Sequence, residues 1–283
     1  MANPQSLLKK FGTAKTLPHV AIRLARLTAD ENSDIQEFEK IIKLDPTLVL
    51  RLLRLVNSPY YGLRQKVDSI SRAVVFVGMK NLRNMVVTEA LKDIFKERKN
   101  SGPFSRHLLF LHCAASAICC QMISERIFGQ NGEDAFLCGI LHDIGMIVED
   151  QVVPDLFSEA CREYQSGQES ITDAEHRMIG TDHCTLGQAL ARDWKLPAEV
   201  QEGIKKHHKY SERMTPDSIA GVMQLSECFV TKLQYPAMPG MEPVLSPLLS
   251  EHIRDNVDEY KALTRDLPEE MGKARDLYSS EKE

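Results

Sequence analysis

Apolar residues recur at helical spacing along most of the chain. In the segment 34–44, Ile35, Phe38 and Ile41 fall on one face of a helix. The run 73–77 fits a strand as well as a helix, and its helical neighbours favour a short buried helix. Similar patterns predict a helix opening at Leu17-Pro18, one after Gly132, and others over residues 34–44, 47–56, 69–76, 80–95, 104–128, 155–165, 171–179, 183–194, 197–208 and 216–233.

Two breaks divide the predicted helices. Residues 96–102 are polar and end in glycine, and three prolines, Pro236, Pro239 and Pro243, mark a second break. We therefore expect an all-α fold with two helical lobes. The expected divisions are an N-terminal helical bundle over 1–102, a second helical bundle over 103–235 and a weakly amphipathic C-terminal helical tail over 236–283.

Composition excludes some classes of protein without naming a function. The 283 residues suffice for a real core, and 43% hydrophobic with 27% charged residues is ordinary for a soluble globular protein. A net charge of -5 gives no bulk attraction to nucleic acid or to an anionic membrane, so neither is expected as a partner. No signal peptide is recognisable, and no apolar run approaches the roughly 20 residues that span a bilayer. Seven cysteines without a CxxC pair suit a reducing cytoplasm.

A histidine and an aspartate, His142 and Asp143, stand side by side at the end of the apolar run 135–141. Buried polar groups are costly unless hydrogen-bonded, and buried charges unless paired or bound to metal. Neighbouring helix positions point about 100° apart, so the two side chains share one site only if they straddle it or if the helix ends there. The pair therefore predicts a polar or metal site within the core.

Five successive helical segments each bring a histidine or a carboxylate. Helix bundles build metal sites in this way, from side chains that project inward from facing helices. Imidazole suits iron, zinc or manganese, and five or six ligands exceed what one tetrahedral zinc needs, so one or two octahedral divalent ions are expected. The candidate metal ligands are His112, His142, Asp143, His183, His207, His208 and Glu227.

Other interpretations of these residues stay open at this point. A lone helical histidine is commonly a hydrogen-bonding core or surface residue. His207-His208 would also suit a solvated helix end, where a positively charged side chain interacts favourably with the helix dipole. Cys113, Cys184 and Cys228 each follow a candidate ligand. The same 100° rotation is expected to turn these cysteines aside, into packing roles.

Several motifs resemble the HDOD (HD-related output domain) proteins of bacterial signalling, a branch of the HD superfamily of metal-dependent phosphohydrolases. The most specific motif is DPTLVLRLLRLVNSPYYG over residues 45–62. The resemblance covers roughly residues 7–233 and leaves the tail out. Also similar are the Leu17-Pro18 opening, SISRAVVFVG over 69–78 followed by Leu82-Arg83-Asn84, LHDIG over 141–145, and His183 with WKLP over 194–197.

The resemblance implies that the family's metal positions fall on the seven candidate ligands, in an HD-domain-like second lobe. Three departures bear on activity. Active branches continue His-Asp-x-Gly with a lysine that can meet a phosphate, where this chain has Met146. The last ligand is Glu227 where the family favours Asp. The Gly-Tyr-Pro of cyclic-di-GMP phosphodiesterases is replaced by KYSER over 209–213, so that activity is not expected.

Three functions are compatible with these features. The resemblance implies a cytoplasmic signal-transduction module that keeps a His/Asp metal site and acts mainly through signalling protein partners. The alternative is an active metal-dependent phosphohydrolase on a phosphomonoester, phosphodiester or nucleotide, with Asp143 as the catalytic bridge between ions. Lys206, Lys209 or Arg106 would then meet the phosphate, although a solvated basic face explains them better. The third is a structural metal, or none. An open metal position would favour the enzyme, and a closed one the module.

Overall fold

The computed structural model describes residues 3–14, 23–24, 35–43, 46–58, 61–96, 103–165, 167, 169–209, 214–240, 243 and 245–279, and within these ranges it contains helices and no strand. The all-α prediction is confirmed. The helices before residue 100 are α1 (Pro4–Ala14), α3 (Ile35–Ile42), α4 (Pro46–Val56), α5 (Ile70–Val77) and α6 (Met79–Ile94). Those after it are α7 (Arg106–Arg126), α8 (Glu133–Leu141), α9 (Ile144–Val152), α10 (Pro154–Gln165), α11 (Ile171–Met178), α12 (His183–Asp193), α13 (Ala198–Lys206), α14 (Ile219–Lys232), α15 (Pro247–Asp255) and α16 (Val257–Ser279).

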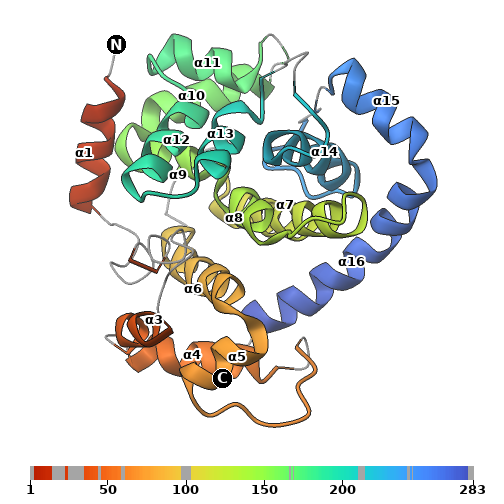
Figure 1. Ribbon diagram of the computed structural model, residues 1–283. Coiled ribbons are helices and arrows are strands. Elements are labelled where there is room, and N and C mark those ends of the chain that lie inside the picture. Colours follow the sequence, from red (N-terminus) through yellow and green to blue (C-terminus); the bar gives the residue numbers. More distant parts are fainter. Residues whose placement is uncertain are drawn as a thin grey trace.

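The smaller lobe consists of α3, α4 and α5, and α6 connects it to the larger lobe by packing against α8 (Figure 1). A buried polar cluster strengthens this connection. The guanidinium of Arg83 on α6 is wholly buried, and its Nη2 donates to Oδ1 of Asp134, at the start of α8, at 2.9 Å. The amide of Asn84 donates to the backbone carbonyl of Glu133 at 2.8 Å. The two lobes are thus joined through charge as well as apolar packing.

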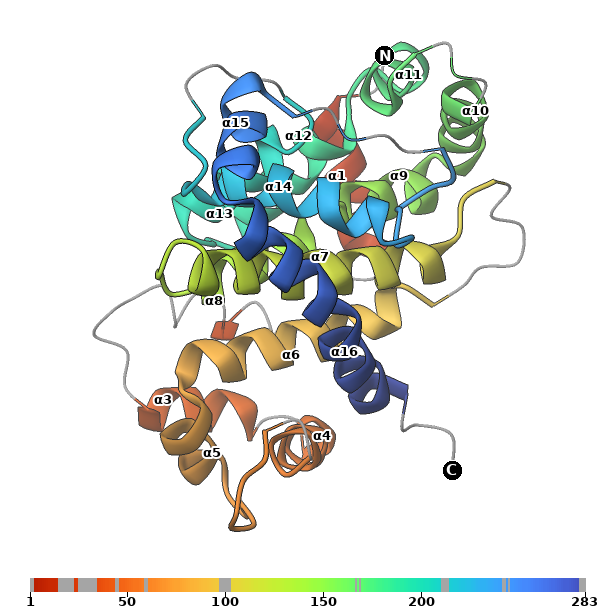
Figure 2. The ribbon, with the colours of Figure 1, turned by 90° about the vertical axis from the view of Figure 1, so that its right-hand side faces the viewer.

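Helix α7 is the central helix of the larger lobe, where it packs against α8, α14 and α16 (Figure 2). The close packing of α8 on α7 depends on Gly139, because a Cβ there would lie 2.5 Å from the Cα of Ala117. By length and hydropathy alone α7 is able to cross a membrane, which the search for long apolar runs did not indicate. Because 72% of its apolar window is buried inside the protein, α7 is accounted for as a core helix.

Most helices lie within a few residues of the positions that the apolar spacing predicts. The spacing does not predict α1, whose Leu7 and Phe11 are buried where the helix packs against α9 and α12. The helix expected from Leu17-Pro18 lies almost wholly outside the described residues, as does most of the polar break at 96–102. The lobe boundaries at 102 and 235 stay predictions.

The C-terminal segment is helical and packs on the larger lobe. Tyr260, Leu263 and Leu267 of α16 recur at helical spacing and are buried along the contact with α7 (Figure 2). The ring of Tyr260 stacks on Phe229 of α14, with ring centroids 4.9 Å apart. The outer face of the same helix is charged and exposed. The weak amphipathicity of this segment is thus explained by a surface helix that buries one face against the bundle and exposes the other to solvent.

Candidate metal centre

A helix break places His142 and Asp143 at one site. Helix α8 ends at Leu141, His142 still has helical angles, and Asp143 (φ -99°, ψ 10°) leaves them before α9 begins at Ile144. Both adjacent side chains can therefore face inward, which a continuous helix would prevent. The break packs against the start of α12, where a Cβ on Gly145 would lie 2.0 Å from the carbonyl oxygen of His183. Glycine at position 145 is thus required by this close approach.

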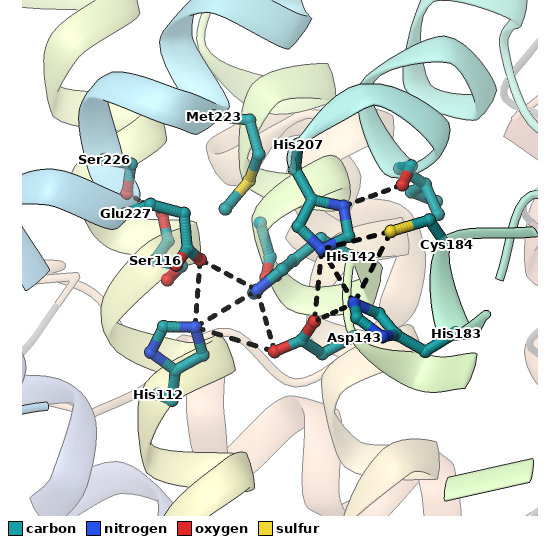
Figure 3. A network of polar contacts seen from close by, with 12 residues as sticks. His112, Ser116, His142, Asp143, His183, Cys184, His207, Met223, Ser226 and Glu227 are labelled. Carbon is teal, nitrogen blue, oxygen red and sulfur yellow. Dashed lines mark hydrogen bonds and ion pairs between the residues drawn. The ribbon is translucent and has the colours of Figure 1, made fainter. Parts of the chain in front are cut away.

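One side of the centre lies between α7, α8 and α14. Nε2 of His112 and Nε2 of His142 both point at Oε1 of Glu227, at 2.9 and 3.0 Å (Figure 3). Oδ2 of Asp143 completes this side, 3.1 Å from Nε2 of His142 and 3.7 Å from Nε2 of His112. All four side chains are buried, with at most 3% of any of them exposed. We call these four residues the Glu227 side.

The other side of the centre lies between α12 and α13, across the same aspartate. Oδ1 of Asp143 is 3.5 Å from Nε2 of His183 and 3.3 Å from Nε2 of His207 (Figure 3). The ring of His208 packs against both histidines, with centroids 5.1 Å from that of His183 and 4.3 Å from that of His207. We call Asp143, His183, His207 and His208 the His183 side. The two carboxylate oxygens of Asp143 thus face two separate sets of ligands.

Four histidines are held by their Nδ1 atoms. The N–H of His112 donates to the carbonyl of Tyr235, that of His142 to Gly139, and that of His207 to Ile204, at 2.7, 2.8 and 2.7 Å. His183 instead donates to the carboxylate of Glu175 at 2.7 Å. These contacts fix the tautomer, so the Nε2 lone pair of each ring points into the centre. Metal-binding histidines are oriented in the same way.

The donor set fits divalent metal ions. Nε2 of His112 faces Nε2 of His142 at 3.1 Å, and Nε2 of His183 faces Nε2 of His207 at 3.2 Å. Such lone pairs repel unless a proton or a metal ion lies between them. Both oxygens of Asp143 are buried and accept no hydrogen bond. Ligand atoms about 2.1 Å from one ion lie about 3.0 Å apart at right angles and about 3.4 Å apart at tetrahedral angles, which matches these spacings.

The buried charges shift each other's pKa in the metal-free protein. Burial opposes a charge on His142, but Asp143 and Glu227 outweigh it and raise the pKa of His142 to about 10. Burial also opposes a charge on His207, where Cys184 and Asp143 raise the pKa to about 9. Against its own burial, Asp143 has a pKa held well below the usual range by the neighbouring imidazoles. Protons therefore occupy this centre when metal does not, and the two compete.

Comparison with known families assigns the chain. A model of the HDOD domain matches residues 14–210, which is more than half of the sequence. The chain belongs to the HDOD family. The helix break at His142-Asp143 and the histidines of α7 and α12 all lie within the matched range.

Solved structures share the HDOD architecture. An HDOD domain protein of unknown function from Geobacter sulfurreducens is 27% identical, with a TM-score of 0.70 and coverage of 97% of this chain and 93% of that one. A Shewanella amazonensis SB2B protein, described as a proposed phosphohydrolase, is 25% identical, with a TM-score of 0.61 and coverage of 92% and 97%. Among curated proteins, an uncharacterized protein of Treponema pallidum is 26% identical over 216 residues. The match takes in 72% of this chain but only 39% of that longer relative.

The centre lies away from the two described cavities. A groove of about 740 Å³ lies between α1 and α12 and is lined by Leu8, Phe11 and Trp194 among others. A second cavity, of about 430 Å³, is lined by Lys206 and Ile219. Neither is lined by a candidate metal ligand. This agrees with the burial of the ligands, because neither of these two cavities reaches the centre.

The structure brings all seven candidate ligands together, and it changes the interpretation of two cysteines. The sulfur of Cys113 lies within 4.8 Å of ligand atoms of His142 and Asp143. Sγ of Cys184 is 3.5 Å from Nε2 of His183 and 3.9 Å from Nε2 of His207, so this thiol is not turned aside (Figure 3). Burial raises the pKa of the thiol, but the two imidazoles outweigh it and lower the pKa to about 6. The 100° argument was wrong here because His183 is the first residue of α12, and its long ring reaches across the space in front of its neighbour.

Two acidic residues behind His183 were not among the candidates. Glu175, on α11, accepts hydrogen bonds from the ring and from the backbone N–H of His183, the latter at 3.0 Å. Glu149, on α9, is wholly buried beside Glu175, and neither of its carboxylate oxygens has a hydrogen-bond partner. Burial and the charge of Glu175 raise the pKa of Glu149 well above its usual range. An acidic residue eight positions before a ligand, across a Gly180 turn, is the signal that could have indicated Glu175.

Two of the basic residues considered for phosphate binding, Arg106 and Lys206, are engaged in ion pairs. Arg106 is buried, donates through Nε to Asp150 at 2.7 Å and through Nη1 to the carbonyl of Ile94 at 2.9 Å, and so is not available. Lys206 is an exposed partner of Glu202, which agrees with a solvated face. Met146 is wholly buried in the core. Among these residues, none presents a free positive charge to the centre.

Proposed function

We propose that this chain is a cytoplasmic signal-transduction module of HDOD type that holds one or two divalent transition ions and acts mainly through protein partners. The observation that carries the proposal is the burial of the ligands within the described part of the chain. The six ligands that make the close contacts are at most 3% exposed, and both described cavities lie elsewhere. A catalytic ion keeps a position open to water or substrate, whereas a structural or regulatory ion is enclosed by protein ligands.

The ligands divide naturally between two ions. His112, His142 and Glu227 would hold one, His183 and His207 with His208 would hold the other, and Asp143 would bridge them. Iron, manganese and zinc suit this mixture of imidazole and carboxylate. Bound ions would supply positive charge that cross-links α7, α8, α12, α13 and α14. The residues of the chain hold and orient these ions, and no step of a reaction is needed for that role.

Exposed apolar residues in the smaller lobe support action through protein partners. Val75 and Phe76 on α5 are 77% and 47% exposed, and Leu50 on α4 is 61% exposed. Large apolar side chains on a surface favour contact with another protein when they gather together. The net charge of -5 supports a protein rather than a nucleic acid or an anionic membrane as the partner.

A metal-dependent phosphohydrolase is the second candidate function. The complete ligand set and the bridging position of Asp143 favour it, since two ions on one carboxylate can polarise a phosphoryl oxygen and lower the pKa of a bound water. A phosphorylated small molecule would then be the partner. Met146 and the engaged guanidinium of Arg106 count against it, because neither offers positive charge to a phosphate.

Elemental analysis of protein purified without chelator tests the metal. We expect a transition metal in the unmodified chain and its loss in His142→Ala, with His107→Ala, an exposed histidine on α7, as the matched control. Absence of any transition metal from the unmodified chain would refute the centre. A panel of phosphomonoesters, phosphodiesters and nucleotides then tests catalysis on metal-loaded protein. We expect no turnover, and turnover that disappears in Asp143→Ala would establish the second candidate instead.

A further inference from the structure

A cysteine sulfur lies near each side of the centre. The sulfur of Cys113 is within 4.8 Å of ligand atoms of His142 and Asp143, and Cys184 contacts two imidazoles of the His183 side. Cys184 follows His183 in the first turn of α12, and its Sγ points at the Nε2 atoms of His183 and His207 (Figure 3). The thiol is buried, with 1% of the residue exposed. Sulfur at this place is therefore in contact with two proposed ligands of one ion and shielded from solvent.

The spacings around this sulfur fit a tetrahedral ion. Zinc binds imidazole nitrogen at about 2.05 Å and thiolate sulfur at about 2.3 Å, so tetrahedral angles place N and S about 3.6 Å apart and two nitrogens about 3.3 Å apart. The observed N···S distances are 3.5 and 3.9 Å, and the observed N···N distance is 3.2 Å. Oδ1 of Asp143 lies 3.5 and 3.3 Å from the same two nitrogens. An octahedral ion would need N···S distances of about 3.1 Å.

We propose that Cys184 is a thiolate ligand of the ion on the His183 side, which then has a Cys-His-His-Asp set formed with His183, His207 and Asp143. The proposal rests on the metal centre of the proposed function. A second observation points to a ligand at this place: Oδ1 of Asp143 is buried there and accepts no hydrogen bond. On binding, the sulfur–metal bond forms with no change in oxidation state, and any sulfur that is still protonated loses its S–H bond and releases the proton to solvent.

His208 is the competing fourth ligand. Its Nε2 atom is buried and has no hydrogen-bond partner, and its ring packs against the other two imidazoles. A site that used His208 in place of Cys184 would contain only nitrogen and oxygen. The presence of sulfur in the coordination shell therefore separates the two arrangements.

A thiolate would give the two sides different metal preferences. Soft sulfur favours zinc or iron, whereas the four residues of the Glu227 side offer nitrogen and oxygen, which manganese also accepts, with the sulfur of Cys113 within 4.8 Å of ligand atoms of His142 and Asp143. Four protein ligands also complete the tetrahedral set of zinc and leave no position for a water. The His183 side would then be a closed structural site, even if an ion on the Glu227 side were able to take another ligand.

Cobalt(II) loading of the full chain tests the thiolate. The protein is stripped with chelator, reloaded with Co²⁺ and examined for the near-ultraviolet charge-transfer band of a cobalt–thiolate bond. We expect the band in the unmodified chain and its loss in Cys184→Ser. It should persist in Cys228→Ser and Cys113→Ser, whose cysteines follow ligands of the Glu227 side, and in His208→Ala.

Each other outcome is decisive. Cobalt binding without the band would overturn the role of Cys184 and leave the metal centre intact, whereas no cobalt binding would overturn both. Loss of the band in Cys113→Ser but not in Cys184→Ser would assign the thiolate to the Glu227 side. If Cys184→Ser fails to fold, X-ray absorption of the zinc-loaded unmodified chain decides. We expect a sulfur neighbour at about 2.3 Å, and only nitrogen and oxygen neighbours would refute the proposal.

Discussion

The two sides of Asp143 have similar ligands in different surroundings. On the Glu227 side, the ring N–H groups of His112 and His142 donate to neutral backbone carbonyls. On the His183 side, the ring of His183 donates to the carboxylate of Glu175, and Glu149 lies behind it. A carboxylate behind an imidazole makes the ring more basic and a stronger metal ligand. Helix packing thus sets where the ligands lie, and the groups behind them set how strongly each side binds.

The largest effect is expected from Asp143→Ala, which removes the only ligand shared by the two sides. Both sides lose an oxygen, and the facing imidazoles keep their mutual repulsion. We expect metal content to fall to none, as measured by elemental analysis after gel filtration. Asp155→Ala, an exposed aspartate on α10, serves as the control and should keep its metal. Retention of one ion by Asp143→Ala would show that one side binds without the bridge.

Acidity should weaken metal binding on both sides of the centre. The pKa of His142 is about 10 on the Glu227 side, and that of His207 is about 9 on the His183 side. Both are raised, so the protonated forms stabilise the metal-free protein at low pH, and this stabilisation is lost as pH rises through 9 and 10. Because a protonated ring cannot bind metal, affinity on the Glu227 side should rise about tenfold per pH unit from 7 to 8, and affinity on the His183 side should rise more steeply, since the pKa of His183 is raised as well as that of His207.

Calorimetric titration in two buffers with different heats of ionisation measures this competition. We expect binding at pH 7 to release about one proton on the Glu227 side, from His142, and more on the His183 side, where the pKa values of both His183 and His207 are raised, besides any proton from Cys184. Metal binding with no proton release would contradict the pKa shifts of these histidines. Proton release on the binding of only one of the two ions would show that the histidines of the other side are already deprotonated before metal binds.

The sequence predicts the helices well because their stability comes from apolar faces that recur in the chain. It indicates the seven candidate residues, which the structure brings together, because histidines and acids are rare inside such faces. The helix break after Leu141 and the approach of Gly145 to His183 depend on tertiary contacts, so periodicity does not contain them. Cys184 was misjudged because the 100° rule describes directions from the helix axis and ignores how far a histidine ring extends. Helix α1 has only a short apolar pattern and depends on the lobe that it covers.

A smaller effect, confined to one side, is expected from Glu175→Gln. The amide can still accept from the ring of His183, but the negative charge behind the ring is lost. Changes of this kind behind a ligand weaken metal affinity about 10- to 100-fold. Competition with a coloured chelator should show weaker binding of one ion and unchanged binding of the other. Equal weakening of both ions would mean that the charge of Glu175 acts on the whole centre rather than on the His183 side.

The smallest effect is expected from Glu149→Gln, which tests whether the second carboxyl behind His183 carries a charge. Burial and Glu175 raise the pKa of Glu149 well above its usual range, and the amide of glutamine copies the shape and neutrality of a protonated carboxyl. A raised folded pKa gives stability that is present below about 4.5 and lost as pH rises through the folded value. Because glutamine does not ionise, the variant does not lose this stability as the pH rises. Thermal unfolding at pH 5 should therefore differ from the unmodified chain by less than about 1 kcal/mol, and at higher pH the variant should be relatively more stable. A strong destabilisation at pH 5, or metal loss as large as in Glu175→Gln, would instead show that Glu149 is ionised and that both acids support His183.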